Sequence, residues 1–130
     1  MKNLVLTVFV ILLFQIYGLG QENVSQPKPA IDPDRFSNDR LWQDEKYTLS
    51  MIVIDLKETK NTTLYILIST KTPKSKTLNE RQKRIVNFLT REQKITRERF
   101  KIVITESPFE QTEYWIVPPE ARSPMNSRNP

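Results

Sequence analysis

The chain lacks two residues on which enzymes often rely, since it contains no Cys and no His. Its two Gly residues, Gly18 and Gly20, both lie near the N-terminus. These absences exclude thiol and imidazole nucleophiles, a Ser-His-Asp triad, Cys or His metal sites, and disulfide bonds. Beyond residue 20 they also exclude the Gly-rich loops that cradle phosphates. A binding or structural module is therefore favoured over an enzyme, and no cofactor is expected.

The N-terminus of the 130-residue chain has the pattern of a secretory signal. Lys2 supplies positive charge, an apolar run extends from Leu4 to Phe14, and Gly18-Leu19-Gly20 places small residues where a signal peptidase cleaves. We predict a signal peptide over residues 1–20 and export to the periplasm or the extracellular space. The alternative is a membrane helix, but the run has about half of the ~20 residues that span a bilayer. No membrane span is expected after cleavage.

Proline residues divide the remaining chain into three parts. Residues 21–39 hold three of the nine Pro among Gln, Asn, Ser and Asp, which is typical of a linker. Residues 118–130 hold four more and are predicted to form a disordered tail. The folded domain is thus expected over 40–117, near the lower size limit for a self-sufficient core. An exported domain without disulfides must rely on that core, which fits a bacterial envelope.

The first half of this domain contains one ambiguous segment and one clear strand. Residues 41–58 have the spacing of one helical face, with acidic residues near the start and Lys near the end. A strand buried on both faces also fits this pattern, and we favour the helix. Residues 63–70 are β-branched and apolar on both faces, which indicates a central strand.

The second half contains the clearest helix, predicted over 77–92. It begins with a capping box formed by Thr77 and Glu80 and carries an apolar stripe of Leu78, Ile85, Phe88 and Leu89. Strands follow over 100–105 and 112–117, and we expect them to form an antiparallel hairpin. The unit 63–105 is long enough for a parallel crossover. The predicted fold is α/β (α+β), an α-β-α-β-β two-layer sandwich whose mixed sheet carries two helices on one face.

The clearest helix also carries a family resemblance. The segment Arg81-Gln82-Lys83-Arg84-Ile85-Val86-Asn87-Phe88-Leu89, followed by Ile95 and Arg99-Phe100, is similar to the OmpA-like, peptidoglycan-associating domain. The closing Glu113-Tyr114-Trp115-Ile116-Val117-Pro118-Pro119 resembles a divergent branch of uncharacterised exported bacterial proteins that end in Trp-Ile-Val-Pro-Pro. The resemblance covers about residues 44–119 and implies an OmpA-like fold with a helix over 44–58.

This resemblance implies a ligand and a site. The family grips the diaminopimelate of the peptidoglycan stem peptide, with a loop Asp on the ammonium and a helix Arg on the carboxylate. Arg81 falls on the family's Arg. The family's Gly-His-Thr-Asp-like loop corresponds here to Ser69-Thr70-Lys71-Thr72-Pro73, which has a Lys and no acid. Half of the ligand clamp is therefore absent from the sequence.

The charge distribution points to an anionic partner. Residues 71–101 contain eleven Lys and Arg but only three Glu. We predict that this segment contacts an anionic envelope component, peptidoglycan or an acidic partner, through the candidate ligand-binding residues Lys71, Lys74, Lys76, Arg81 and Arg84. The alternatives are that the Arg81 stem covers the core and that the other charges form a solvated face. Nucleic acid is not an expected partner, because Phe88 and Phe100 have buried spacing.

An enzymatic alternative depends on Glu106, Glu110 and Glu113, which cluster around a turn like a glycosidase carboxylate pair. Glutamates near a turn are far more often surface charges, so we expect no catalytic residues and no metal. The sequence predicts an exported, non-catalytic binding or structural module of the bacterial cell envelope. The alternatives are a protein-interaction domain with no small ligand and a carboxylate-based cell-wall hydrolase.

Overall fold

A computed structural model describes residues 28–29, 36–121 and 123–124 of the chain. The predicted signal peptide therefore lies outside the described residues. The main elements are helices α2 (Trp42–Glu58) and α3 (Lys76–Asn87) and strands β3 (Thr63–Thr70), β4 (Phe100–Glu106) and β5 (Gln111–Val117). Two-residue strands β1 (Lys28–Pro29) and β2 (Phe36–Ser37) precede them.

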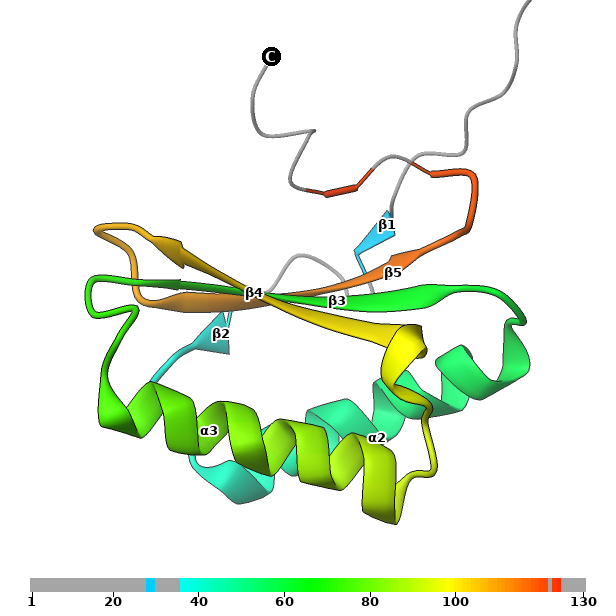
Figure 1. Cartoon of the computed structure of the whole chain (residues 1–130), viewed down its shortest axis with the longest axis horizontal. Coiled ribbons are helices and arrows are strands. Elements are labelled where there is room, and N and C mark those ends of the chain that lie inside the picture. Colours follow the sequence, from blue (N-terminus) through cyan, green and yellow to red (C-terminus); the bar gives the residue numbers. More distant parts are fainter. Residues whose placement is uncertain (1–27, 30–35, 122, 125–130) are drawn as a thin grey trace, which may run out of the picture.

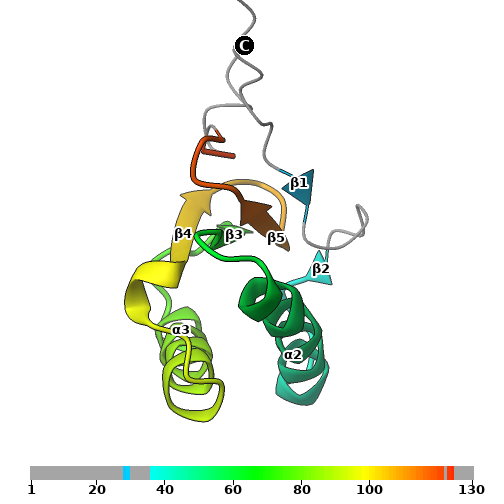
Figure 2. The ribbon, with the colours of Figure 1, turned by 90° about the vertical axis from the view of Figure 1, so that its right-hand side faces the viewer.

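The strands form one mixed sheet in the order β1-β5-β3-β4, and β2 also pairs with β5. Strand β3 is parallel to β4 and antiparallel to β5. Both long helices lie on the same face of this sheet, as Figures 1 and 2 show from two directions. The predicted two-layer class, with the order α-β-α-β-β among the main elements, is confirmed.

Apolar side chains fill the space between the two layers. Helix α2 buries one face, and α3 with the π-helical turn η1 (Phe88–Glu92) buries the stripe that the sequence predicted. These side chains pack against alternate residues of β3 and against Phe100 and Tyr114. The core consists of Leu49, Ile52, Val53, Leu56, Leu64, Ile66, Ile68, Leu78, Ile85, Phe88, Leu89, Ile95, Phe100 and Tyr114.

The N-terminal cap of α3 differs from the predicted capping box. The Ser75 hydroxyl accepts a hydrogen bond from the Leu78 backbone N–H at 3.2 Å, and the helix begins at Lys76. The box on Thr77 and Glu80 is thus wrong by two residues. Ser75 and Thr77 are both residue types that can cap a helix. Burial of Leu78 sets the position of the first turn, and Ser75 is then the residue whose hydroxyl reaches the Leu78 N–H.

The predicted hairpin between the last two strands is wrong. Strand β3 lies between β4 and β5, and the four residues 107–110 carry the chain across its end. Four residues reach up to about 13 Å, enough to cross one strand, which requires about 10 Å. The Ser107 N–H donates to the Thr70 carbonyl at 2.9 Å during this crossing. Strands that are apolar on both faces usually lie inside a sheet. The apolar faces of β3 therefore favour a position with a hydrogen-bonded strand at each of its two edges.

The sheet also reaches beyond the predicted domain start at residue 40. Strand β2 pairs Phe36 with Thr112, and Phe36 packs edge-on against Tyr114 at 5.8 Å between ring centroids. Part of the predicted linker over 21–39 therefore belongs to the sheet edge. In the predicted tail, a turn closes between the Ala121 N–H and the Pro118 carbonyl, while residues 122 and 125–130 lie outside the described part. Among the described helices, none has the length and apolar character needed to cross a membrane.

Candidate functional site

A pocket of about 250 Å³ opens at the end of the sheet where β3 stops and α3 begins. Its wall brings together the end of β3, the loop that follows, the first turns of α3 and the crossing between β4 and β5. Most of the groups that line it are hydroxyls, amides or charged side chains. The lining residues are Asn38, Thr70, Thr72, Ser75, Thr77, Leu78, Arg81 and Glu110.

Arg81 forms the inner wall of this pocket and is held by Glu45 of α2. Its Nη2 lies 2.6 Å from Glu45 Oε1, and its Nε lies 3.1 Å from both carboxylate oxygens. The two side chains are only 11% and 5% exposed. The guanidinium also donates to Thr112 Oγ1 at 2.8 Å and to Asn38 Oδ1 at 3.3 Å. Arg81 is therefore held by the protein's own groups, from α2, from β5 and from the turn after β2.

Tyr114 completes the buried part of the cluster. Its hydroxyl donates to Glu45 Oε1 at 3.0 Å. Burial and then the charge of Glu45 raise the pKa of the Tyr114 hydroxyl. Burial acts to lower the pKa of Arg81, but the hydrogen bond and charge of Glu45 outweigh it, so that pKa is raised. Both shifts favour the same state of the cluster, with Arg81 charged and Tyr114 protonated.

Glu110 stands at the pocket mouth, where its carboxylate is held by the loop after β3. Oε1 accepts from the Lys71 backbone N–H at 2.6 Å and from Thr70 Oγ1 at 3.0 Å, and Oε2 accepts from Asn38 Nδ2 at 3.0 Å. These donors, Asn38 first, lower the pKa of Glu110. A general acid of a glycosidase needs a raised pKa. The Glu110 carboxylate has the opposite shift and stays ionised.

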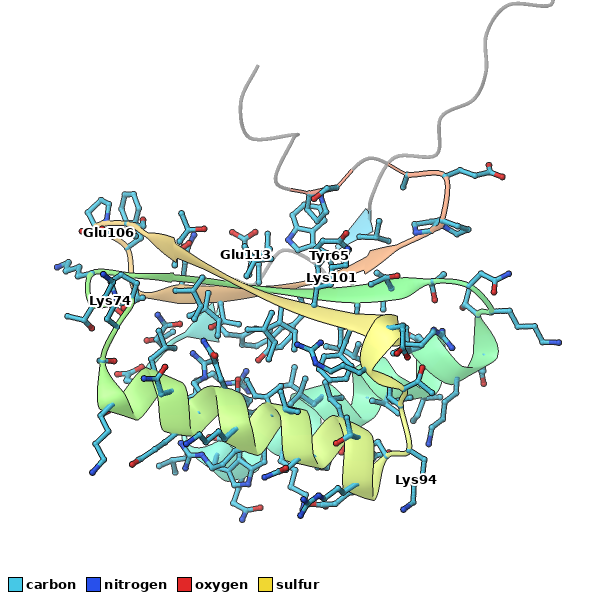
Figure 3. The ribbon with its side chains drawn as sticks, in the orientation of Figure 1. Tyr65, Lys74, Lys94, Lys101, Glu106 and Glu113 are labelled. Carbon is cyan, nitrogen blue, oxygen red and sulfur yellow. The ribbon has the colours of Figure 1, made fainter. Side chains whose placement is uncertain are left out.

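The predicted ligand-binding residues do not all meet at this pocket. Arg81 lines it, and Lys71 lines an adjoining hollow of about 340 Å³ with Glu106, Ser107 and Pro108. Lys74 and Lys76 are exposed in the loop and first turn beside it, and Lys76 lies 4.0 Å from Glu80. Arg84 instead lies over the ring of Trp42 at 5.6 Å. Figure 3 labels Lys74 at the pocket end of the molecule.

Sequence reasoning missed three residues that build this site. Glu45 has a readable signal, because it shares the buried face of α2 with Leu49, Ile52 and Leu56. A carboxylate on a core-facing position requires a cationic partner. Asn38 lies in the predicted linker, and Glu110 is exposed, as a surface charge would be, while its carboxylate is bonded to the loop after β3. The sequence around Asn38 and Glu110 gives no signal that predicts their hydrogen bonds. Their partners lie 31 to 74 residues away along the chain.

Across the described residues, no three His, Cys, Asp or Glu side chains gather in a way that could hold a metal ion. The chain matches no protein-family model, no curated protein and no solved structure. The OmpA-like resemblance therefore stays a prediction that depends on the residues quoted for it.

Proposed function

We propose that this protein is an exported, non-catalytic binding module of the bacterial cell envelope that contacts peptidoglycan or another anionic component. The observation that carries the proposal is the hydroxyl-lined pocket at the start of α3, with Arg81 in its wall and Glu110 at its mouth. Ligands of open α/β sheets bind outside the carboxyl ends of parallel strands. The pocket lies at that end of β3, beside the loop that enters α3.

The charges around the pocket favour a ligand that carries an anionic group. Lys71, Lys74 and Lys76 surround the approach to α3, whose first turn contains no acidic residue. Unsatisfied backbone N–H groups at a helix start favour a carboxylate or a phosphate. Arg81 acts as a positioning residue, since its guanidinium already binds Glu45 and orients the pocket wall.

Glu110 adds a second element of recognition. The loop after β3 lacks the acid found in OmpA-like domains, but the Glu110 carboxylate is bonded to that loop through Thr70 and Lys71. An ionised carboxylate beside a basic rim fits a group with both charges, such as the amino-acid end of a peptidoglycan stem peptide. An ammonium would then face Glu110, and a carboxylate would face the lysines.

Binding to purified peptidoglycan sacculi tests the proposal. We expect the protein to cosediment with sacculi, and this binding to weaken with salt because exposed charges are screened over about 8 Å at physiological ionic strength. The double variant Lys74→Gln/Lys76→Gln should bind about three- to tenfold more weakly, given the modest energy of exposed charges. The matched control is Lys60→Gln/Lys94→Gln, which removes two exposed charges. Lys60 lies in the turn before β3, and Figure 3 labels Lys94 at the end of the molecule opposite Lys74.

Equal binding by both double variants at every salt concentration would contradict the pocket as the binding site. An absence of cosedimentation would contradict peptidoglycan as the ligand.

A second candidate, a protein-interaction domain with no small ligand, is favoured by one surface of α2. Tyr47, Met51 and Ile54 follow at helical spacing and are 69%, 48% and 51% exposed. Apolar side chains gathered in this way are typical of protein contacts. If Met51→Ser reduces envelope binding while Lys74→Gln/Lys76→Gln does not, this second function replaces the first.

A further inference from the structure

The sheet face opposite the helices carries two adjacent aromatic side chains. Tyr65 of β3 pairs with Trp115 of β5 on one side and with Lys101 of β4 on the other, and Trp115 pairs with Pro29 of β1. One row thus crosses four strands. Figure 3 shows Tyr65, Lys101 and Glu113 on the side of the sheet away from α2 and α3. Both aromatic side chains are partly exposed.

Polar neighbours hold these rings in place. The Trp115 indole N–H donates to Glu113 Oε2 at 3.1 Å, and Gln111 Nε2 donates to Glu113 Oε1 at 3.3 Å. This chain of hydrogen bonds runs along β5 and fixes the indole over its own strand. The Lys101 ammonium lies 5.4 Å from the centre of the Tyr65 ring. The two rings are therefore ordered before any ligand arrives, which lowers the entropy cost of binding.

We propose that this row, the Tyr65–Trp115 platform, binds a strand of neutral sugar polymer. Sugar rings have apolar C–H faces that stack on aromatic rings, and their hydroxyls need nearby amide and charged groups. Gln111, Glu113 and Lys101 supply such groups around the platform. Lys101 and Glu113 carry charges of opposite sign, and this combination suits a polymer without net charge.

The same arrangement disfavours single-stranded nucleic acid, the other polymer that stacks on sheet aromatics. Such sites combine the rings with a positively charged groove that follows the phosphates. Among the described strands, this face instead places the Glu113 carboxylate beside the Trp115 indole and Lys101 beside Tyr65, which is not a row of positive charges. The platform is also separate from the pocket, because it lies on the sheet face away from α2 and α3 and uses none of the residues that line the pocket. The inference therefore does not depend on the proposed function.

Tryptophan fluorescence gives a direct test, because the chain has only Trp42 and Trp115. The variant Trp42→Phe keeps an aromatic ring against Phe88 and leaves Trp115 as the reporter. Titration with a neutral N-acetylglucosamine hexamer should shift and saturate the Trp115 emission. Adding Tyr65→Val, which keeps a β-branched residue in the strand, should weaken binding about tenfold, as expected for one stacking ring. Tyr65→Phe should restore it.

The matched control is Tyr47→Val, which removes an exposed tyrosine from α2 on the other side of the molecule. It should leave the titration unchanged. The proposal is overturned if the hexamer produces no saturable change, or if Tyr65→Val and Tyr47→Val behave alike. A response to oligothymidylate that exceeds the response to the hexamer would assign the platform to nucleic acid instead.

Discussion

Two arginines tie the helices to the sheet at opposite ends of the molecule, and their partners differ in charge. Arg81 binds the Glu45 carboxylate together with Thr112 and Asn38. Arg99 donates to backbone carbonyls in and after the last turn of α2, those of Leu56, Thr59 and Thr62, at 2.6, 3.0 and 2.8 Å. The first is a buried ion pair, and the second satisfies a helix C-terminus.

The difference shows why two similar residues have different roles. Removing Arg81 leaves a buried negative charge without its partner, which strongly destabilises the fold. Removing Arg99 takes donors away from neutral carbonyls in and after the last turn of α2 and leaves no charge without a partner. A residue of the first kind makes the wall of a polar pocket rigid. A residue of the second kind closes the end of a helix and has no part in the proposed site.

The largest expected effect is that of Arg81→Met. Loss of one partner of a buried ion pair lowers the free energy of unfolding by about 3–5 kcal/mol. Urea denaturation followed by circular dichroism measures this loss. The control is Arg84→Met on the same helix, whose guanidinium is exposed over Trp42 and should change stability by less than about 0.5 kcal/mol. Equal effects of the two substitutions would show that Glu45 does not depend on Arg81.

Arg99→Met should have a smaller effect, about 2 kcal/mol, because hydrogen bonds from a charged group to carbonyls are lost without stranding a charge. The same denaturation experiment measures it. Arg99→Lys should recover little of the loss, since an ammonium lacks the planar set of donors that reaches three carbonyls. If Arg99→Met lowered the free energy of unfolding by more than Arg81→Met does, the claim that the buried ion pair contributes more to stability would be wrong.

The smallest effect is that of Glu110→Gln, and it should depend on pH. The folded-state pKa of Glu110 is below its ordinary value of 4.5, so its contribution to stability is present above that value. The contribution is lost as the pH falls through the lower, folded-state pKa. The melting temperatures of the wild type and the variant should therefore differ at pH 7 and converge at lower pH. A difference that is unchanged at low pH would show that the donors around Glu110 do not stabilise its ionised form.

The sequence predicted the parts of the fold that depend on local periodicity. The residues Leu78, Ile85, Phe88 and Leu89 recur at helical spacing, and all four are buried. The apolar residues on both faces of the strand over 63–70 predict a central strand, and β3 lies between β4 and β5. These predictions hold because burial of one face is decided by neighbours within a few residues.

The parts that could not be predicted depend on contacts between distant segments. Four residues between two strands permit both a hairpin and a crossing, and the choice depends on what lies beside β3. The Arg81–Glu45 pair joins residues 36 positions apart, and no spacing rule connects them. Phe36 and Asn38 have the composition of a linker around them, although their contacts with β5 and Glu110 place them in the sheet edge and the site.

The account places ligand binding at the Arg81 end of the molecule and a purely structural role at the Arg99 end. The most direct test of this difference is a map of ligand contacts along the chain. Backbone amide shifts of the labelled protein would be recorded during titration with a diaminopimelate-containing stem tripeptide that carries no sugar. The account predicts shifts over residues 70–77 and at Glu110, with residues 59–62 and Arg99 unchanged. Saturable shifts confined to residues 59–62 and Arg99, or no shifts at all, would contradict it.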